Sequence, residues 1–507
     1  MKVLKKLKNI NQLIKEIDME RINGATIVYC HGVFDLLHIG HIKYFQEAKS
    51  LGDVLVVTIT PDRFVNKGPD RPAFGEDIRT EAVASLDVVD YVAINEFPTA
   101  VETIRYLKPD YYVKGPDYKE HSRDISGNIQ LEEKAVRSVG GEMVYTSDIT
   151  FSASSLINQH FSNYSGEQRE FLDSLKKNYS VEQIIQYIER FQELDVLLVG
   201  EAIIDEYVFC DTIGKSGKEP VLVNQKIRSE KYSGGICAVA NHVSNFCNHA
   251  DIITYLGEVE SEKDFITKSL NPNCELFTVI KSKSPTIKKT RFVDNYTGTK
   301  TLGVYDLNDD LLNSTEEAEI MTKFEAIFAK NDVVISADYG HGLITSRIVE
   351  YMEDKSSFLA VNTQLNASNI GYHSISKYHS ADYICIHEGE LRHDYRNRTD
   401  SVENLVKDLS AKIKTYIIVI TCGKAGSLAY MNNNFYYCPA YATKIVDRVG
   451  AGDTLLAITS LCFAAGVPAD LTLFIGNLAA AQMVATTGTG MKLNKVNLIK
   501  YIESILK

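Results

Sequence analysis

Residues 29–41 read Tyr29-Cys30-His31-Gly32-Val33-Phe34-Asp35-Leu36-Leu37-His38-Ile39-Gly40-His41, and this stretch decides how the front of the chain folds. The apolar residues from Thr26 onward predict a buried strand, and the apolar spacing from Ile42 to Ala48 predicts a helix. A strand that turns through glycine into a helix presents free backbone N–H groups and the positive end of the helix dipole at the turn. The two histidines of His-x-Gly-His share one face of the first helical turn and can donate to phosphate oxygens. A single histidine at a helix start is usually structural, but this full context predicts a phosphate site.

The composition argues against several classes of protein. With 507 residues, 45% of them hydrophobic, the chain is long enough for about two to four domains with large cores. A net charge of −12 and the lack of a long basic block argue against nucleic-acid binding through bulk electrostatics. The nine cysteines include no Cys-x-x-Cys pair, which argues against a zinc site or a disulfide framework and suits a reducing cytoplasm. No apolar run reaches the length of a membrane span, and residues 1–24 predict one amphipathic helix that packs on its own domain or on a second copy of the chain, not a signal peptide.

Strands and helices alternate through residues 25–161, which we expect to form the first domain. Apolar runs at 53–60, 88–94, 111–113 and 141–145 predict strands, whereas 78–83 and 98–107 predict helices. This alternation is typical of an α/β fold with a doubly wound parallel sheet that is covered by helices on both faces. Ligands of such sheets bind beyond the carboxyl ends of the strands, where the loops should gather.

The run from Gly32 to His41 resembles the signature of the cytidylyltransferase-like nucleotidyltransferases, a Rossmann-like family. The resemblance implies that His38 and His41 are catalytic and contact the α- and β-phosphates of a nucleoside triphosphate while a substrate phosphate attacks it. It also implies that these residues bind the nucleotide: Gly32, Phe34, Lys67, Arg79, Ser152 and Ser154. The structural alternatives are a solvated loop around Lys67 and an ordinary helix N-cap for the serines.

The choice of base stays open between adenine and cytosine. Three stretches resemble the adenylyltransferase half of the bifunctional heptose phosphate kinase/heptose 1-phosphate adenylyltransferases, here with the domain order reversed: 67–72, Lys114-Gly115-Pro116-Asp117-Tyr118 and 139–142. The glycerol 3-phosphate cytidylyltransferases carry Arg-Thr-Glu before their Ile-Ser-Thr-Thr run, whereas Thr146-Ser147-Asp148 stands here. The nucleoside triphosphate used by the first domain is therefore ATP or CTP.

Residues 162–194 are polar with helical spacing and lack the composition of a flexible tether, which predicts a helical connector. Ser180-Val181-Glu182-Gln183 predicts a capping box within it. From 195 to 507 each glycine-bearing loop follows a predicted strand, which again indicates a doubly wound sheet. In the run Gly450-Ala451-Gly452-Asp453, the glycines let backbone N–H groups approach a phosphoryl group, and Asp453 can take a proton from an attacking hydroxyl.

These loops, in this order, resemble the ribokinase-like (PfkB) sugar kinases. The resemblance implies that Asp453 is the catalytic base and that Glu390 helps to hold Mg²⁺ through water. It also implies that a small β lid, with strands in 222–231 and 292–305, covers the sugar. It implies an anion hole from Gly450, Ala451 and Gly452, an ATP site lined by Thr421, Gly423 and Gly426, and a sugar site lined by Asp205, Gly234 and Gly235. The family resemblance further implies a homodimer formed through the lids.

The chain departs from these kinases at the substrate and metal ends of the site. The heptose kinases have Gly-Gly-Ala-Ala-Asn where Gly234-Gly235-Ile236-Cys237-Ala238 stands, and the family's Asp-Pro-Lys is Asn362-Thr363-Gln364 here. The leading hypothesis is a cytoplasmic bifunctional enzyme that phosphorylates a sugar or polyol with ATP·Mg²⁺ and then joins the phosphate to a nucleotide. The alternative is a nucleotidyltransferase whose kinase-like domain only binds or regulates. Sugars or sugar phosphates and nucleoside triphosphates are the expected partners, without nucleic acid or membrane.

Overall fold

The computed structural model describes residues 2–69, 71–119, 124, 127–147, 158, 164–486 and 493–507. Contacts between residues divide the chain into two compact units, of which the first comprises 1–163 with 496–507 and the second 164–495. Residues 164–194, the expected connector, therefore cluster with the second unit, and the last twelve residues cluster with the first. Each unit is built on a parallel sheet covered by helices, which confirms the predicted α/β class.

The first unit holds a five-stranded parallel sheet in the order β3-β2-β1-β4-β5. Its strands are β1 (Ile27–Gly32), β2 (Val54–Ile59), β3 (Tyr91–Ile94), β4 (Tyr111–Lys114) and β5 (Glu142–Tyr145). Its helices are α1 (Lys2–Lys6), α2 (Ile10–Ile22), α3 (Ile39–Lys49), α4 (Glu76–Ala84), α5 (Val101–Leu107), α6 (Asn128–Ser138) and, from residue 496 on, α18 (Lys495–Leu506). The strand order reverses between β1 and β4, which is where ligands of such sheets bind.

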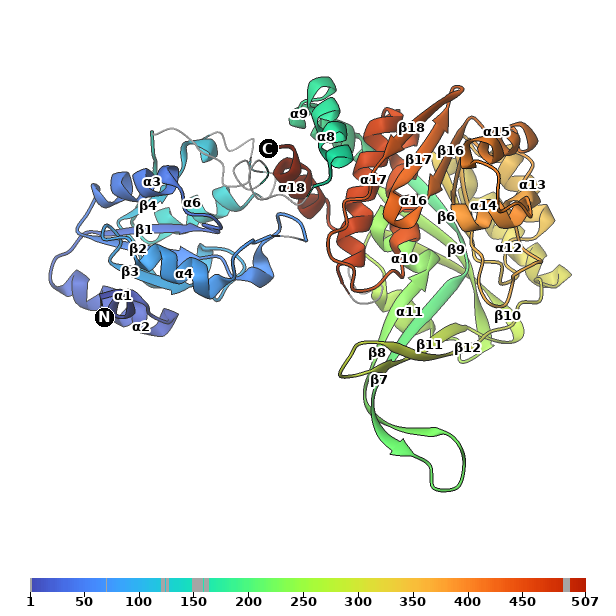
Figure 1. Ribbon diagram of the computed structural model, residues 1–507, viewed down its shortest axis with the longest axis horizontal. Coiled ribbons are helices and arrows are strands. Elements are labelled where there is room, and N and C mark those ends of the chain that lie inside the picture. Colours follow the sequence, from blue (N-terminus) through green and yellow to red (C-terminus); the bar gives the residue numbers. More distant parts are fainter. Residues whose placement is uncertain are drawn as a thin grey trace. The chain divides into compact units, whose positions relative to one another are not determined.

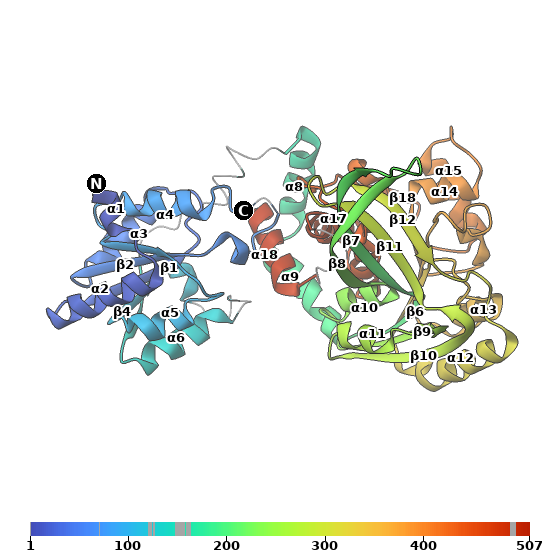
Figure 2. The same cartoon turned by 90° about the horizontal axis from the view of Figure 1, so that it is seen from below.

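Alternate residues of β1 enter two separate cores, one on each face of this sheet. Ile27 and Tyr29 pack with α2, α5 and α6, whereas Val28 and Cys30 pack with α3 and α4. Figure 2 shows these two sets of helices on opposite faces. This arrangement agrees with the near-continuous apolar runs that predicted buried parallel strands.

The amino-terminal segment forms two helices, not the single helix expected over residues 1–24. Asn9 starts α2 as its N-cap, and Gln12 completes a capping box, so the helical run is interrupted between Lys6 and Ile10. Leu13 and Ile17 are buried in the first unit, but Leu4 is 74% exposed. Residues of α2 therefore pack on their own domain, one of the two arrangements expected, whereas Leu4 is open to the other, a contact with a second copy of the chain.

The second unit holds a nine-stranded sheet in the order β10-β9-β6-β13-β14-β15-β16-β17-β18, in which β17 runs antiparallel to both of its neighbours. These strands are β6 (Asp195–Gly200), β9 (His249–Val259), β10 (Cys274–Pro285), β13 (Val333–Asp338), β14 (Leu359–Thr363), β15 (Tyr383–His387), β16 (Ile417–Thr421), β17 (Ser427–Met431) and β18 (Asn434–Cys438). The helices α10 (Ile236–Val243), α16 (Ala451–Ala464) and α17 (Ala469–Val484) cover one face. The helices α12 (Ser314–Ile327), α13 (Ser346–Lys355), α14 (Glu388–Asp394) and α15 (Val402–Lys412) cover the other.

A separate four-stranded sheet, the lid, adjoins the carboxyl end of β6. It has the order β12-β11-β7-β8 and consists of β7 (Ala202–Lys215), β8 (Leu222–Gly235), β11 (Ile287–Asp294) and β12 (Lys300–Asp306). The short helix α11 (Lys263–Ser269) lies between β9 and β10 in sequence. Figure 1 shows β7 and β8 continuing as a long hairpin beyond the rest of the lid. The lid strands expected at 222–231 and within 292–305 are present.

The segment between the sheets forms α8 (Gly166–Asn178) and α9 (Val181–Glu189). The predicted capping box at Ser180 is confirmed, because its side chain accepts from the backbone N–H of Gln183 and the Gln183 side chain accepts from that of Ser180. Ile184, Ile188 and Phe191 are buried, as their helical spacing suggested. Among the residues that the structure describes, no helix combines the length and apolarity needed to cross a bilayer.

Candidate active sites

The stretch after β1 forms a tight turn that delivers His38 to the start of α3. Phe34 lies in the left-handed region with φ of 48°, and its ring packs so closely on Gly32 that a Cβ there would come within 3.0 Å of it. His38 is the N-cap of α3, and its Nδ1 accepts the backbone N–H of Gly40 at 3.1 Å. Because Nδ1 accepts, the hydrogen of a neutral His38 ring resides on Nε2.

The two histidines of the motif lie face to face. The ring centroids of His38 and His41 are 3.9 Å apart with an interplanar angle of 23°. Burial, with smaller contributions from the neighbouring His38 and Lys67 charges, lowers the pKa of His41 to about 3. Burial also lowers the pKa of His38. Both rings are therefore neutral at neutral pH, and the structure brings Lys67 close to them.

Lys67 belongs to a loop that gathers charges beside the motif. Burial lowers its pKa to about 8, the charges of Lys507, Arg71 and Lys500 act in the same direction, and Asp35 opposes them. The Arg71 guanidinium lies 3.5 Å from the buried Asp35 carboxylate. A cluster with more cations than carboxylates favours an anionic ligand.

Arg79, expected to contact the nucleotide, is placed differently by the structure. Its side chain is fully buried, and its guanidinium donates to the carbonyl oxygens of Phe74 and Thr60, each at 2.8 Å, and to that of Val33. It also donates to the Asp62 carboxylate at 2.6 Å. These contacts tie α4 to the loops after β1 and β2, which favours a positioning role for Arg79 over direct nucleotide contact.

A second buried ion pair lies at the switch point between β1 and β4. Lys114 at the end of β4 is 2.9 Å from Glu132 of α6, and both side chains are almost completely buried. Lys114 also lies over the ring of Tyr118. The strand that ends in Lys114-Gly115 could be recognised from the sequence, but the sequence does not show which acidic residue Lys114 meets. Ser152 and Ser154 lie outside the described residues.

In the second unit, Asp453 lies in the first turn of α16, three residues after the N-cap Gly450. Its Oδ1 accepts the hydroxyl of Tyr339 at 2.9 Å. Burial raises the pKa of Asp453 to about 6, the nearby Asp205 adds to the rise, and Tyr339 and Lys289 counteract it. A carboxylate with a pKa just below neutrality is suited to act as a general base.

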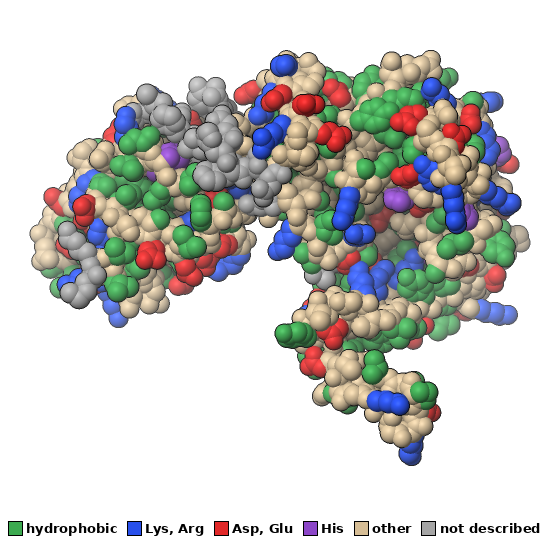
Figure 3. Space-filling model, viewed as in Figure 1, with side chains coloured by type: hydrophobic (Ala, Val, Ile, Leu, Met, Phe, Trp, Pro, Cys, Tyr) green, Lys and Arg blue, Asp and Glu red, His purple; other side chains and the backbone are tan. Residues whose placement is uncertain are grey.

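The lid places two cations next to Asp205. Lys289 of β11 is directly opposite Asp205 of β7 in the parallel register, and the Arg291 guanidinium donates to the Asp205 carboxylate. A Cβ on Gly234 would come within 2.2 Å of Asp205 Oδ2, so only glycine leaves room for this carboxylate. Figure 3 shows Lys and Arg side chains gathering on the hollowed face of the second unit above the lid hairpin. Asp205, Gly234 and Gly235 are therefore brought together, as expected, with Lys289 and Arg291 as partners that sequence reasoning missed.

The remaining predicted residues lie at the carboxyl ends of the strands. Thr421 ends β16 and is paired with His387 of β15, whose backbone N–H donates to Glu390 at 2.7 Å. Gly423, with φ of 58°, and Gly426, with φ of 94°, bracket the turn into β17. The Glu390 carboxyl also accepts the N–H of Leu365 at 3.0 Å. Its burial raises its pKa to about 7, and the charge of Asp453 contributes to that rise.

Glu390 fits a role in holding a hydrated magnesium ion. Each of its oxygens accepts one backbone N–H and keeps a second lone pair, which could accept a hydrogen bond from a metal-bound water. Carboxylate oxygens are the ligands that Mg²⁺ prefers, directly or through water. The donor set therefore agrees with the role that the sequence resemblance implied.

Two further groups near Asp453 were not predicted. Glu201, fully buried at the end of β6, accepts the backbone N–H groups of Tyr339 and His341, both at 3.0 Å. The His341 ring meets Asp309 through Nδ1 at 2.6 Å, and its buried Nε2 has no partner within the described part of the chain. Glu201 thereby holds the loop that positions Tyr339 against Asp453.

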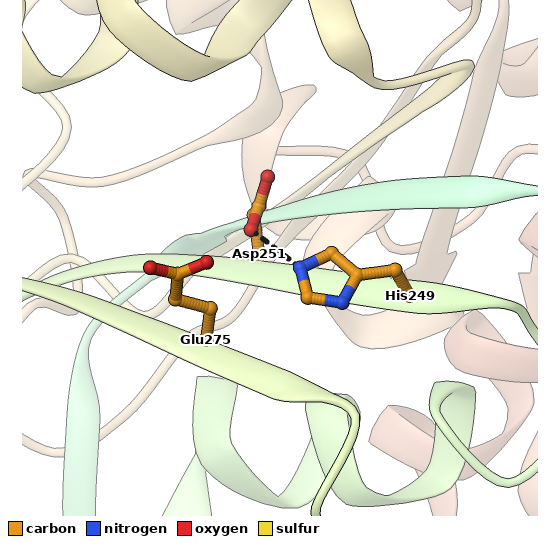
Figure 4. A group of neighbouring side chains, drawn as sticks. All are labelled: His249, Asp251 and Glu275. Carbon is orange, nitrogen blue, oxygen red and sulfur yellow. Dashed lines mark hydrogen bonds and ion pairs between the residues drawn. The ribbon is translucent and has the colours of Figure 1, made fainter.

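A third cluster, drawn in Figure 4, has the composition of a metal site but is explained by hydrogen bonds. His249 and Asp251 of β9 and Glu275 of β10 offer ligand atoms within 4.8 Å of one another. His249 Nε2 already lies 2.9 Å from Asp251 Oδ1, and Asn331 donates to Oδ2 at 3.0 Å. The cluster also lies at the amino ends of these strands, opposite the edge that carries Asp453.

Comparisons with known proteins match both units. The family model of pfkB family carbohydrate kinases matches residues 193–495, and the cytidylyltransferase-like model matches residues 29–165. The bifunctional protein HldE of Geobacter metallireducens is 46% identical over 135 residues, which are 25% of this chain and 28% of that protein. The HldE protein of Nitratiruptor is 45% identical over 122 residues, 24% of this chain and 26% of that protein. The matched part thus spans little more than a quarter of the length of these curated relatives.

Solved structures of a phosphofructokinase and a ribokinase each align with about three fifths of the chain. Phosphofructokinase-2 from Escherichia coli in complex with substrates and products aligns with a TM-score of 0.49 and 15% identity, over 61% of this chain and 99% of that one. The ribokinase of Arabidopsis thaliana complexed with ribose and ATP aligns with a TM-score of 0.46 and 15% identity, over 62% and 99%. The two family matches confirm the expected combination of a nucleotidyltransferase domain with a PfkB kinase domain.

Proposed function

The chain belongs to the pfkB family of carbohydrate kinases, and we propose that it is a bifunctional enzyme of nucleotide-sugar synthesis. The second unit phosphorylates a sugar, a polyol or one of their phosphates with ATP. The first unit transfers a nucleotide from ATP or CTP to the phosphorylated product and releases pyrophosphate. The final product is an ADP- or CDP-linked sugar or polyol. The observation that carries the proposal is a pair of separate helix starts suited to phosphate, one with the stacked rings of His38 and His41 and one with Asp453 in the first turn of α16.

In the kinase step, Asp453 takes the proton of the acceptor hydroxyl as its oxygen attacks the γ-phosphorus of ATP. The bond from that phosphorus to the bridging oxygen breaks, and ADP leaves. The backbone N–H groups from Gly450 to Gly452, at the start of the 14-residue helix α16, would stabilise the charge on the transferring group. Magnesium bound with ATP would neutralise phosphate charge, and Glu390 would orient one of its waters.

The lid supplies the acceptor site in this proposal. Asp205 can accept hydrogen bonds from acceptor hydroxyls, while Lys289 and Arg291 hold its charge in place and leave a cationic surround. One buried and one partly buried cation beside a single carboxylate favour an acceptor that itself carries negative charge. We therefore propose a sugar or polyol phosphate as the preferred acceptor among the classes above.

In the transferase step, an oxygen of the substrate phosphate attacks the α-phosphorus of the nucleotide in line, and pyrophosphate leaves. The neutral His38 ring donates through Nε2, and Lys67 supplies a positive charge, so both can stabilise charge that develops on the phosphates. No covalent intermediate is needed, because positioning and charge stabilisation suffice for phosphoryl chemistry of this kind.

A matrix of ATP and CTP against sugar phosphates, read by pyrophosphate release, tests the first unit. ADP formation from ATP with sugars, polyols and their phosphates tests the second. We expect His38→Ala to abolish pyrophosphate release and to spare ADP formation, and Asp453→Asn to do the reverse. Loss of both activities from either substitution, in a protein that still folds, would show that the two sites are not independent.

The alternative is a nucleotidyltransferase with an inert kinase-like unit. It is supported by Asn362-Thr363-Gln364, which stands where the kinase family has Asp-Pro-Lys. Asn362 donates to the carbonyl of Cys385 at 2.6 Å, so this residue links strands β14 and β15. Against the alternative, Asp453 keeps its hydroxyl partner and Asp205 keeps its cations. ATP binding without ADP formation across the whole acceptor panel would support the alternative.

We also propose that the chain forms a homodimer through its lids. The edge strands β8 and β12 expose several apolar side chains: Leu222 at 69%, Ile227 at 47%, Leu302 at 58% and Val304 at 44%. Exposed apolar edge strands are ready to pair with another chain. Light scattering should give a dimer for the parent and a monomer for Leu302→Asp. Tyr372→Ser, a change at another exposed aromatic residue, should leave the dimer intact.

A further inference from the structure

The helix α18, dark red in Figure 1, lies outside both matched family regions except for its first residue, Lys495. The pfkB model ends at residue 495 and the cytidylyltransferase-like model ends at residue 165, whereas α18 continues to Leu506. Its residues from Val496 onward nevertheless cluster with the first unit. The chain therefore completes the kinase unit and then adds a segment to the nucleotidyltransferase unit.

The contacts of α18 lead directly to the loop that carries Lys67. The ring of Tyr501 lies against Gly68, where a Cβ would come within 2.2 Å of the ring. Asn158 donates to the carbonyl oxygen of Ser504 at 2.6 Å and accepts from Arg71 at 3.1 Å. Gly68 and Arg71 both follow Lys67 in the same loop, so the loop is held against the helix.

The charges on α18 reinforce the cationic cluster beside the histidines. Lys500 is half-buried, and it interacts with Asp124 and with the buried pair Lys114 and Glu132. The positive charges of Lys500 and Lys507 both lower the pKa of Lys67, and the charge of Lys67 in turn lowers the pKa of His41. Lys67 is thus the common neighbour of the histidine motif and α18. Cations that are held together by packing repel one another unless an anion lies between them.

We propose that α18 forms one wall of the nucleotidyltransferase site and that Lys500 binds a phosphate group there. This inference rests on the proposed function of the first unit. Lys500 is the better candidate of the two lysines, because it is half-buried within the helix whereas Lys507 is exposed. The bound group is a phosphate of the nucleotide or of the sugar phosphate, and the two share the same chemistry of recognition.

Kinetic measurements on the full-length chain show whether Lys500 binds a phosphate of the nucleotide or that of the sugar phosphate. Lys500→Gln should lower kcat/KM for pyrophosphate release by about 10- to 100-fold, as expected for the loss of one charge-assisted contact. A rise in KM for the nucleotide would assign Lys500 to its phosphates, and a rise in KM for the sugar phosphate would assign it to the acceptor. ADP formation by the second unit should not change.

Lys495→Gln is the matched control, because Lys495 starts the same helix but belongs to the second unit. It should alter pyrophosphate release by less than twofold. If Lys500→Gln behaves like Lys495→Gln, the inference is wrong while the proposed function stands. If the parent releases no pyrophosphate with any pair of substrates, the proposed function itself has failed.

Hydrogen exchange gives a readout that does not depend on turnover. Adding magnesium pyrophosphate to the full-length chain should slow amide exchange in peptides from 33–41 and also in peptides from 496–506. Lys500→Gln should reduce the protection of 496–506. Protection of 33–41 alone would overturn the inference, and protection of neither segment would count against the nucleotidyltransferase site as a whole.

Discussion

Replacing Asp453 by asparagine should change the activity and the stability of the second unit in opposite directions. Asp453 is 9% exposed, and burial together with the charge of Asp205 raises its pKa to about 6. The folded protein therefore holds a carboxylate where the surroundings favour the neutral acid. Such strain is expected at a catalytic base and not at a residue kept for stability.

The size of the effect follows from the pKa. An aspartate in an unfolded chain titrates near 3.9, so a folded-state pKa of about 6 corresponds to about 3 kcal/mol of destabilisation above pH 6. The direction in which stability changes with pH follows from the number of protons that each state binds. Between about pH 4 and pH 6 the folded state binds more protons than the unfolded state, so stability falls as the pH rises through this window. Below about pH 4 both states are protonated and the penalty disappears.

Asp453→Asn should remove this penalty and raise the free energy of unfolding of the second unit by up to about 3 kcal/mol at pH 7.5. At pH 4 the gain should be close to zero. Calorimetry of the full-length chain at both values measures the difference, with the transition of the second unit identified by its response to ATP. The same variant should lose about 10²- to 10⁴-fold in ADP formation, because the general base is gone.

Tyr339→Phe provides the control. The Tyr339 hydroxyl donates to Asp453 and lowers its pKa, so its loss should move the acid limb of the ADP-formation profile from near pH 6 to a higher pH. A hydrogen bond to a charged group contributes about 1.5–3 kcal/mol, which corresponds to a move of about one to two pH units. The reasoning is refuted if Asp453→Asn destabilises the second unit at pH 7.5, or if Tyr339→Phe leaves the profile unmoved.

The other predictions concern the first unit. His38→Ala should reduce pyrophosphate release by about 10²- to 10³-fold through loss of one donor to the developing charge, and an unchanged rate would exclude His38 from the site. Pyrophosphate release should fall as the pH rises through about 8, because Lys67 loses its proton there. Lys67→Arg should extend the activity to higher pH, since a guanidinium stays charged. A parent pH profile that is flat up to pH 10 would contradict this prediction. Arg79→Met should destabilise the first unit by about 3 kcal/mol, seen in its melting transition, because three partly buried carbonyl oxygens lose their donor. Normal stability with a raised KM for the nucleotide would instead support direct contact by Arg79.

Several features of the candidate sites could be predicted because they depend on neighbours in sequence. The spacing of His38 and His41 placed both rings on one helical turn, and the structure stacks them. The glycines around residue 450 predicted a helix start beside Asp453, and α16 begins there. The lid pairing could not be predicted, because Lys289 meets Asp205 through the register of strands 84 residues apart. Alternation along β11 shows only that Lys289 and Arg291 share a face.

Local pattern in the chain established the two layered folds, the turn and helix that carry the histidines, and the position of Asp453 at a helix start. These depend on short-range geometry, in which the periods of strands and helices and the freedom of glycine act over a few residues. Long-range packing established the partners of each charge. Through this packing the Arg79 guanidinium donates to backbone carbonyl oxygens, and the Tyr339 hydroxyl donates to Asp453. It also brought α18 back to Gly68, because a residue's burial and pKa depend on the side chains that surround it in space and not on those that adjoin it in the chain.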